Sequence, residues 1–124
     1  MDGAVPLASV IEGLRDVLGP NVRINAHPGV AKDEDAATIA KHASVVSFDV
    51  VLDDIAIRQA FKGQWTGDDY QRTFKVLTKG AAQVVPHILV GLRKGIIAGE
   101  YEALDFLIGE GVEKIIFIVL IPTK

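Results

Sequence analysis

The fold is decided by residues 84–121, which read VVPHILVGLRKGIIAGEYEALDFLIGEGVEKIIFIVLI. The apolar runs at 84–90 and 114–121 have the length and the β-branched content of buried strands. Between them the sequence predicts a loop with three glycines at 91–99 and a helix at 100–109. A strand, a helix and a strand in this order indicate a right-handed crossover between two parallel strands.

The same alternation extends through the rest of the chain, with no linker and no low-complexity segment. Helices are expected at 6–18, at 32–43 and from Thr66 or Asp68 to Gly80, strands at 22–27 and 45–52, and a short amphipathic segment at 55–61. Four consecutive βα units indicate one α/β domain with a parallel sheet over residues 1–124. Because a full (β/α)₈ barrel needs about 250 residues, we expect half of a TIM-like barrel.

The composition excludes several classes of protein. Thirteen Lys and Arg against 16 Asp and Glu give a net charge of -3, so nucleic acid is not an expected partner. The absence of cysteine excludes disulfides and thiolate metal sites. The longest apolar run, at 115–121, is too short for a bilayer, and the N-terminus lacks a basic region followed by an apolar run. We therefore expect a cytoplasmic protein with no membrane partner.

Polar residues interrupt three of the apolar strands, namely Asn25, His27, Ser47, Asp49 and His87. Alternation puts Asn25 with His27, and Ser47 with Asp49, on one face of its strand. Each residue alone is most simply a hydrogen-bonded polar group of the core. Since ligands of βα folds bind at the carboxyl ends of the strands, the group together predicts the lining of a substrate pocket.

Two other kinds of chemistry receive little support. His27, Asp49 and His87 are residue types that bind zinc, but the chain has no H-x-x-x-H or H-x-H pair, and we predict no metal site. No serine lies in a G-x-S-x-G turn, so hydrolysis by a serine nucleophile is not supported, and no catalytic residue is assigned. A dinucleotide-binding fold lacks its G-x-G-x-x-G turn.

The loop after residue 90 carries the most specific motif of the chain. Glycines at 91, 95 and 99 permit backbone conformations that other residues avoid, which either a long loop or a closely approaching ligand would require. Residues 95–102, GIIAGEYE, fit the G-x-I-x-G-x-x-E pattern of the radical S-adenosylmethionine superfamily at Gly95, Ile97, Gly99 and Glu102. The chain resembles the biotin synthase and lipoyl synthase-like branch of that superfamily.

The resemblance covers essentially the whole chain, which matches the third to the sixth strand of the partial barrel. It implies that Ile97 packs near the adenine of S-adenosylmethionine, that Gly95 and Gly99 shape the turn, and that the backbone at Leu120, Ile121 and Pro122 meets the adenine edge. Asn25, Asp49 and His87 would line the substrate side. The complete enzyme would cleave S-adenosylmethionine reductively with a [4Fe-4S] cluster, and the resulting 5′-deoxyadenosyl radical would abstract hydrogen from an unknown substrate.

The chain departs from the superfamily in one respect that decides activity. The CxxxCxxC loop that holds the cluster is missing, so these residues cannot bind the cluster through thiolates. We therefore expect a fragment, a split subunit or a descendant without the chemistry, inactive alone and completed by an N-terminal half-barrel or by a second copy of itself. The alternative is a non-catalytic half-barrel that self-associates as a scaffold or binding module.

Overall fold

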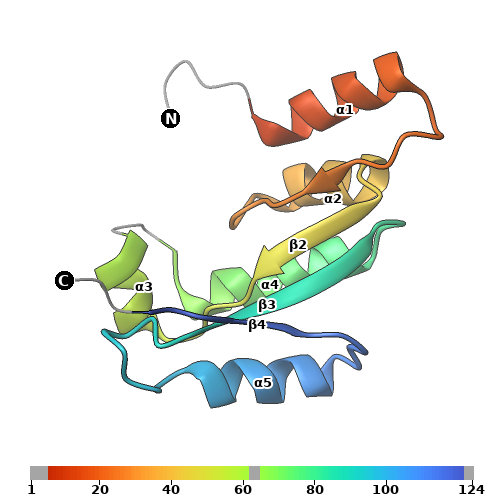
Figure 1. The fold of residues 1–124 in the computed structure, drawn as a ribbon. Helices are drawn as coiled ribbons and strands as arrows, with labels where there is room; N and C mark the ends of the chain where they lie inside the picture. The colour runs from red at the N-terminus through yellow and green to blue at the C-terminus, as the bar shows by residue number, and fades with distance from the viewer. Residues whose placement is uncertain (1–5, 62–64, 122–124) are drawn as a thin grey trace. The chain divides into compact units, whose positions relative to one another are not determined.

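The computed structural model describes residues 6–61 and 65–121. Within them helices and strands alternate as α1 (Leu7–Leu18), β1 (Asn25–Ala26), α2 (Asp33–His42), β2 (Val45–Asp49), α3 (Asp54–Phe61), α4 (Gly67–Thr78), β3 (Gln83–Val90), α5 (Glu100–Gly109) and β4 (Ile116–Val119) (Figure 1). No helix of this described part has the length and apolarity needed to cross a lipid bilayer.

The strands form one four-stranded parallel sheet in the order β1-β2-β3-β4. β1 pairs with β2 so that Asn25 lies opposite Val45, and β3 pairs with β4 so that His87 lies opposite Ile116. Strand order equal to sequence order is typical of successive βα units of a barrel, whereas doubly wound sheets reverse their order. The α/β class with parallel strands is thus confirmed, and the half-barrel is compatible with this order.

Three strands are shorter than the sequence predicts. The strand expected at 22–27 is reduced to Asn25–Ala26, that at 114–121 to Ile116–Val119, and that at 45–52 to Val45–Asp49. β1 and β4 are the first and last strands in the order, so within the described residues each has a strand neighbour on one side only. Each of these two strands therefore extends only as far as its pairing with that one neighbour. The amphipathic segment expected at 55–61 is the helix α3.

The chain divides into two compact units, and the first comprises residues 1–48 and 73–84. Its core includes Ile39 of α2, Phe48 of β2 and Phe74 of α4, with the two phenylalanine rings 6.4 Å apart between centroids. Arg15 of α1 donates from Nε to the carbonyl of His42 at 2.9 Å, which ties α1 to the end of α2. Helix α1 buries only Ala8 and Ile11.

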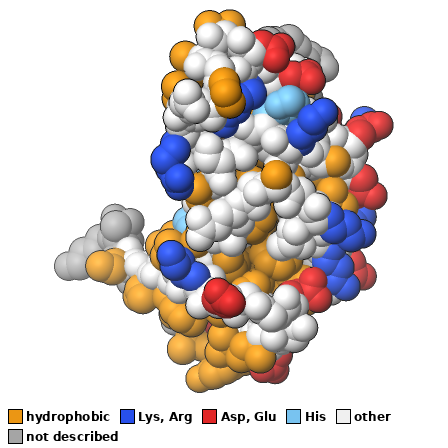
Figure 2. Space-filling view, turned by 90° about the vertical axis from the view of Figure 1, so that its right-hand side faces the viewer, with side chains coloured by type: hydrophobic (Ala, Val, Ile, Leu, Met, Phe, Trp, Pro, Cys, Tyr) orange, Lys and Arg blue, Asp and Glu red, His pale blue; other side chains and the backbone are white. Residues whose placement is uncertain are grey.

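The second unit comprises residues 49–72 and 85–124. Side chains from its elements form a core of Val50, Val51, Ala56, Ile57, Ile88, Ala103 and Leu107. Large apolar side chains of α5 and β4 stay outside this core, and Figure 2 shows hydrophobic side chains gathered over the part of the second unit where these two elements lie. Those more than half exposed are Tyr101, Ile108, Phe117 and Val119.

Candidate functional site

Asp49 and His87 form the polar centre of the second unit's strands. Asp49 ends β2, His87 lies in the middle of β3, and Asp49 Oδ1 is 3.4 Å from His87 Nδ1. The next residue, Val50, donates its backbone N–H to the carbonyl of His87 at 2.9 Å, so the two side chains stand at the same height along the strands. The side chain of His87 is 11% exposed and that of Asp49 is 31% exposed.

The alternation of β3 shows which face of the sheet carries this pair. Pro86 and Ile88 are buried, and Ile88 lines one cavity together with Val50 and with Ala103 of α5. His87 points to the opposite side of β3, because neighbouring residues of a strand alternate. Asp49 precedes Val50 and therefore also points away from α5. The Asp49–His87 pair lies on the sheet face that α5 does not cover.

The other predicted pocket residues belong to the first unit. Asn25 is paired with Val45, so it shares a face of the β1–β2 ladder with Val45 and with Ser47, as the alternation predicts. Asn25 and His27 are exposed, and Ser47 is half-buried. Convergence of all five polar side chains in one pocket stays a prediction, and so does the absence of a metal site.

Tyr70 of α4 is a third titratable group near this pair that the sequence did not single out. Its side chain is buried, and burial together with the negative charge of Asp49 raises the pKa of its hydroxyl. Nothing in the local sequence distinguishes Tyr70 from an aromatic residue of the core. Only the fold brings it into the electrostatic range of Asp49.

Glycines are required at two positions of the loop between β3 and α5 for different reasons. Gly95 has a φ of 83°, and its N–H donates to the carbonyl of Gly91 at 2.8 Å, which closes a tight turn. At Gly99 the backbone is ordinary, but a Cβ atom would lie 2.5 Å from the Cβ of Asp53. A larger residue at 99 would push the loop away from the start of α3.

The carboxylate of Glu100 accepts hydrogen bonds from the backbone at both ends of this loop. It accepts the backbone N–H of Gly91 at Oε2 and that of Ala98 at Oε1, both at 2.7 Å. Burial raises the pKa of Glu100, but the backbone hydrogen bonds outweigh burial and hold the pKa below its usual value. The glutamate that orders the loop is therefore Glu100, whereas the motif glutamate Glu102 is exposed on the first turn of α5.

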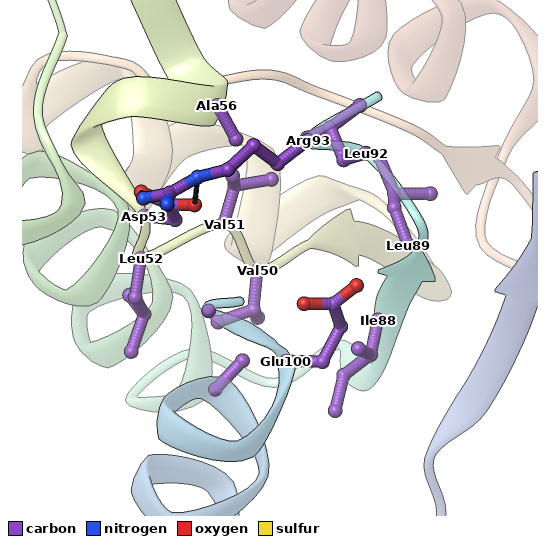
Figure 3. Close-up of a pocket in the computed structure, with 12 residues that line it drawn as sticks. Val50, Val51, Leu52, Asp53, Ala56, Ile88, Leu89, Leu92, Arg93 and Glu100 are labelled. Atoms are coloured by element: carbon purple, nitrogen blue, oxygen red, sulfur yellow. Dashed lines mark hydrogen bonds and ion pairs between the residues drawn. The ribbon is translucent and has the colours of Figure 1, made fainter. Parts of the chain in front are cut away.

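The Glu100 hydrogen bonds are one clamp of this loop, and a second clamp, the Asp53–Arg93 ion pair, joins the loop to α3 (Figure 3). Arg93 donates from Nε to Oδ2 of Asp53 and from Nη2 to Oδ1, each at 2.7 Å. Asp53 also accepts the N–H of Ile55 at 3.1 Å, where it caps the start of α3. The Arg93 hydrogen bonds are the largest influence on Asp53 and hold the pKa of its carboxyl below the usual value.

These clamps border an apolar cavity on the α5 side of the sheet. Figure 3 shows Arg93 reaching across to Asp53 at one side of it and Glu100 on another. The other lining side chains are apolar. They come from the segment after β2, from β3, from the glycine loop, from α3 and from α5, and include Val50, Val51, Leu52, Ala56, Ile88, Leu89, Leu92 and Ala103.

The residues that the resemblance assigns to adenine lie at one end of the second unit. Leu120 donates its N–H to the carbonyl of Val90 at 3.0 Å, and a Cβ on Gly91 would lie 3.7 Å from the carbonyl oxygen of Leu120. The end of β4 and the start of the glycine loop are thus in contact. Ile97 is 55% exposed and Ile121 is 82% exposed, while Pro122 lies outside the described residues.

Comparison of the chain with models of protein families, with curated proteins and with solved structures finds no match. The geometry of the second unit is therefore the basis of the functional argument.

Proposed function

We propose that this chain is the C-terminal half of a radical S-adenosylmethionine barrel domain, and that the adenosine of S-adenosylmethionine binds at the glycine loop and the end of β4. The hydrogen bond from Leu120 to Val90 carries this proposal, because it brings the segment after β4, which the resemblance assigns to adenine, to the start of the loop that contains the G-x-I-x-G-x-x-E motif. Both segments offer exposed apolar side chains there, those of Ile97 and Ile121. A flat aromatic base suits such a surface.

The two groups that the resemblance implies fit this chain differently. The adenosine part fits, since Gly95, Leu120 and Ile121 offer backbone and apolar side chains and none of the three is charged. The iron–sulfur cluster does not fit, because the chain contains no thiolate ligand. We therefore assign the cluster to another polypeptide segment or subunit and derive no chemical step from this chain.

In this proposal the chain's own residues position and shield the reactants. Glu100 and the Asp53–Arg93 pair hold the loop in shape, so that the adenosine surface exists before the ligand arrives. Asp49 and His87, on the sheet face away from α5, contact the substrate. We propose the cytoplasm as the compartment, where iron–sulfur enzymes find a reducing environment.

Amide NMR titration of the full chain with S-adenosylmethionine and with 5′-deoxyadenosine tests the proposal. We expect shifts at residues 95–99 and 120–121 for both ligands and affinities in the millimolar range, because the anchoring of the methionyl group is missing. Ile97→Asp should abolish the shifts, and Asp105→Asn, at an exposed position of α5 outside the motif, should leave them unchanged. Shifts elsewhere only, or none at 10 mM ligand, contradict the proposal.

A second candidate function, a self-associating scaffold, is favoured by one observation. Phe117 and Val119 of β4 and Tyr101 and Ile108 of α5 are each more than half exposed. Monomeric proteins seldom leave large areas of apolar surface in water. A second copy of the chain could cover them, and the oligomeric state tests this candidate.

A further inference from the structure

We infer that the apolar cavity on the α5 side of the sheet binds a small neutral carbonyl compound, with a short branched aliphatic group inside the cavity and the carbonyl oxygen at Arg93. The lining residues lie between 50 and 56 and between 88 and 103, so the second unit alone forms the cavity. The inference goes beyond the proposed function, because the lining residues differ from Ile97, Leu120 and Ile121, to which that proposal assigns adenosine.

The size and the wall of the cavity suit a short aliphatic group. The cavity encloses about 290 Å³, including its open mouth, which is just below the range of about 300–1,000 Å³ typical of small-molecule sites. Branched aliphatic side chains form most of its wall, namely Val50, Val51, Leu52, Ile88, Leu89 and Leu92. A branched hydrocarbon group packs against such a wall with many close contacts.

The interior of the cavity offers little to a water molecule. A buried water needs about two to four polar partners, and the polar side chains of the lining stand at its border (Figure 3). Both carboxylate oxygens of Asp53 and of Glu100 already accept hydrogen bonds. An apolar group that enters therefore gains contacts without displacing a well-bound water.

Arg93 is the side chain at this border that can still donate hydrogen bonds. A guanidinium has five N–H groups, and Arg93 directs one from Nε and one from Nη2 to Asp53. Within residues 6–61 and 65–121 the guanidinium has no other hydrogen-bond acceptor, and the Arg93 side chain is 33% exposed. A ligand with an acceptor oxygen at the mouth can use the remaining N–H groups.

The charges at the border select a neutral head group. Asp53 and Glu100 carry two negative charges against the one positive charge of Arg93, and Arg93 and Glu100 are each within electrostatic range of the other two groups. A third carboxylate at Arg93 would be repelled by the two that are present. An ammonium group would lose hydration beside an apolar wall, where both carboxylates already have their hydrogen bonds. The carbonyl of an amide or a ketone avoids both costs.

Three probes with one branched skeleton test the inference in amide NMR titrations of the full chain: isobutyramide, isobutyrate and isobutylammonium. We expect isobutyramide to shift the backbone signals of Val51, Leu89 and Ala103 and the Nε–H signal of Arg93, with an affinity in the millimolar range. Both ions should bind at least about tenfold more weakly. Acetamide, which is two carbons shorter, should lose up to about fourfold in affinity per carbon.

Matched variants locate the aliphatic group. Ala103→Val should fill part of the cavity and lower the affinity for isobutyramide at least about tenfold, whereas Ile108→Ala, at an exposed position of the same helix, should leave it unchanged. If Ala103→Val disturbs the fold, Leu92→Ala provides an independent test. Leu92 is half-buried, and the loss of its side chain from the wall should weaken isobutyramide more than acetamide.

Four results would overturn the inference: equal binding of isobutyrate, equal binding of acetamide, binding that both Ala103→Val and Leu92→Ala leave unchanged, or no shifts at tens of millimolar isobutyramide. The adenosine titration is separate from these results. Isobutyramide shifts at Val51 and Leu89 would support the inference whether or not adenosine shifts residues 120–121. Their absence would reject the carbonyl ligand and leave the adenosine proposal standing.

Discussion

Arg93 in the glycine loop holds Asp53, forty residues earlier, with two hydrogen bonds of 2.7 Å. The paired geometry of a guanidinium and a carboxylate fixes both distance and orientation, which a single point charge does not. Since Asp53 also caps α3, this one carboxylate joins the start of a helix to the loop that follows β3. The loop and α3 should therefore respond together when the pair is broken.

Arg93→Ala should lower the thermal midpoint of unfolding and increase amide hydrogen exchange both in residues 91–99 and at the start of α3. The reason is that Asp53, whose side chain is 11% exposed, would lose its partner and keep its charge. Arg93→Lys should recover only part of the loss, because an amine cannot form both bonds. Exchange that rises in the loop alone would show that the pair does not couple the two segments. Lys94→Ala, at a neighbouring exposed position, is the control.

Acid should weaken the second unit in a defined range of pH. The pKa values of Asp53 and Glu100 are lower in the folded chain than their ordinary values of 3.8 and 4.5. The unfolded chain therefore binds protons first, so the stabilisation is complete above about pH 5 and is lost as the pH falls through the folded-state values. Urea unfolding between pH 7 and pH 3 should show this decline. Glu100→Gln should make it shallower, and an unchanged slope would contradict the assignment.

Alkali should weaken the chain through Tyr70. Its pKa is higher in the folded state than the ordinary value of 10.0, so folding favours the neutral phenol. The stabilisation is present below pH 10 and is lost as the pH rises through the folded-state value. Tyr70→Phe should reduce the loss of stability between pH 9 and pH 11, whereas Tyr101→Phe, at an exposed position of α5, should not. Urea midpoints across this range measure the difference.

The sequence predicted the helices more accurately than the strand ends. Gly19 ends α1 and Glu100 opens α5 at the positions expected from local signals, since helix ends depend on nearby residues. Strand ends depend on a neighbour that is distant in sequence, and three of the four predicted strands were accordingly too long. Alternation alone predicted correctly that Ser47 and Asp49 share a face of β2.

The clamps of the candidate site could not be predicted in the same way. Arg93 and Asp53 lie in different βα units, and nothing in either local sequence indicates the other. The motif directed attention to Glu102, yet Glu100 makes the hydrogen bonds, because the loop folds back to residue 91. The periodicity of α1 identified its apolar positions but not what covers them, and Val10, Leu14 and Val17 are exposed.

Gly99→Ala should destabilise the chain by about 1–3 kcal/mol, because its Cβ would lie 2.5 Å from the Cβ of Asp53 and backbone must move. Gly13→Ala is a matched control in α1, where a Cβ meets nothing within 4 Å. Alanine favours a helix interior over glycine, so Gly13→Ala should stabilise the chain by about 0.5–1 kcal/mol. Chemical unfolding of the two variants should give opposite signs. A neutral Gly99→Ala would mean that α3 and the loop are not held as closely as the structure has them.

Self-association through β4 should be detectable at tens of micromolar chain. β4 is the last strand of the order β1-β2-β3-β4, so one of its edges has no strand neighbour in the described residues, and an unpaired edge readily adds a strand from another chain. Phe117 and Val119 would be covered at the same time, which removes apolar surface from water.

Phe117→Asp with Val119→Lys should raise the dissociation constant for self-association at least about tenfold. Val17→Lys, at an 83% exposed position of α1 in the first unit, should leave it unchanged. Light scattering that reports a monomer for the unaltered chain would exclude the scaffold candidate and leave the adenosine proposal to its own titration.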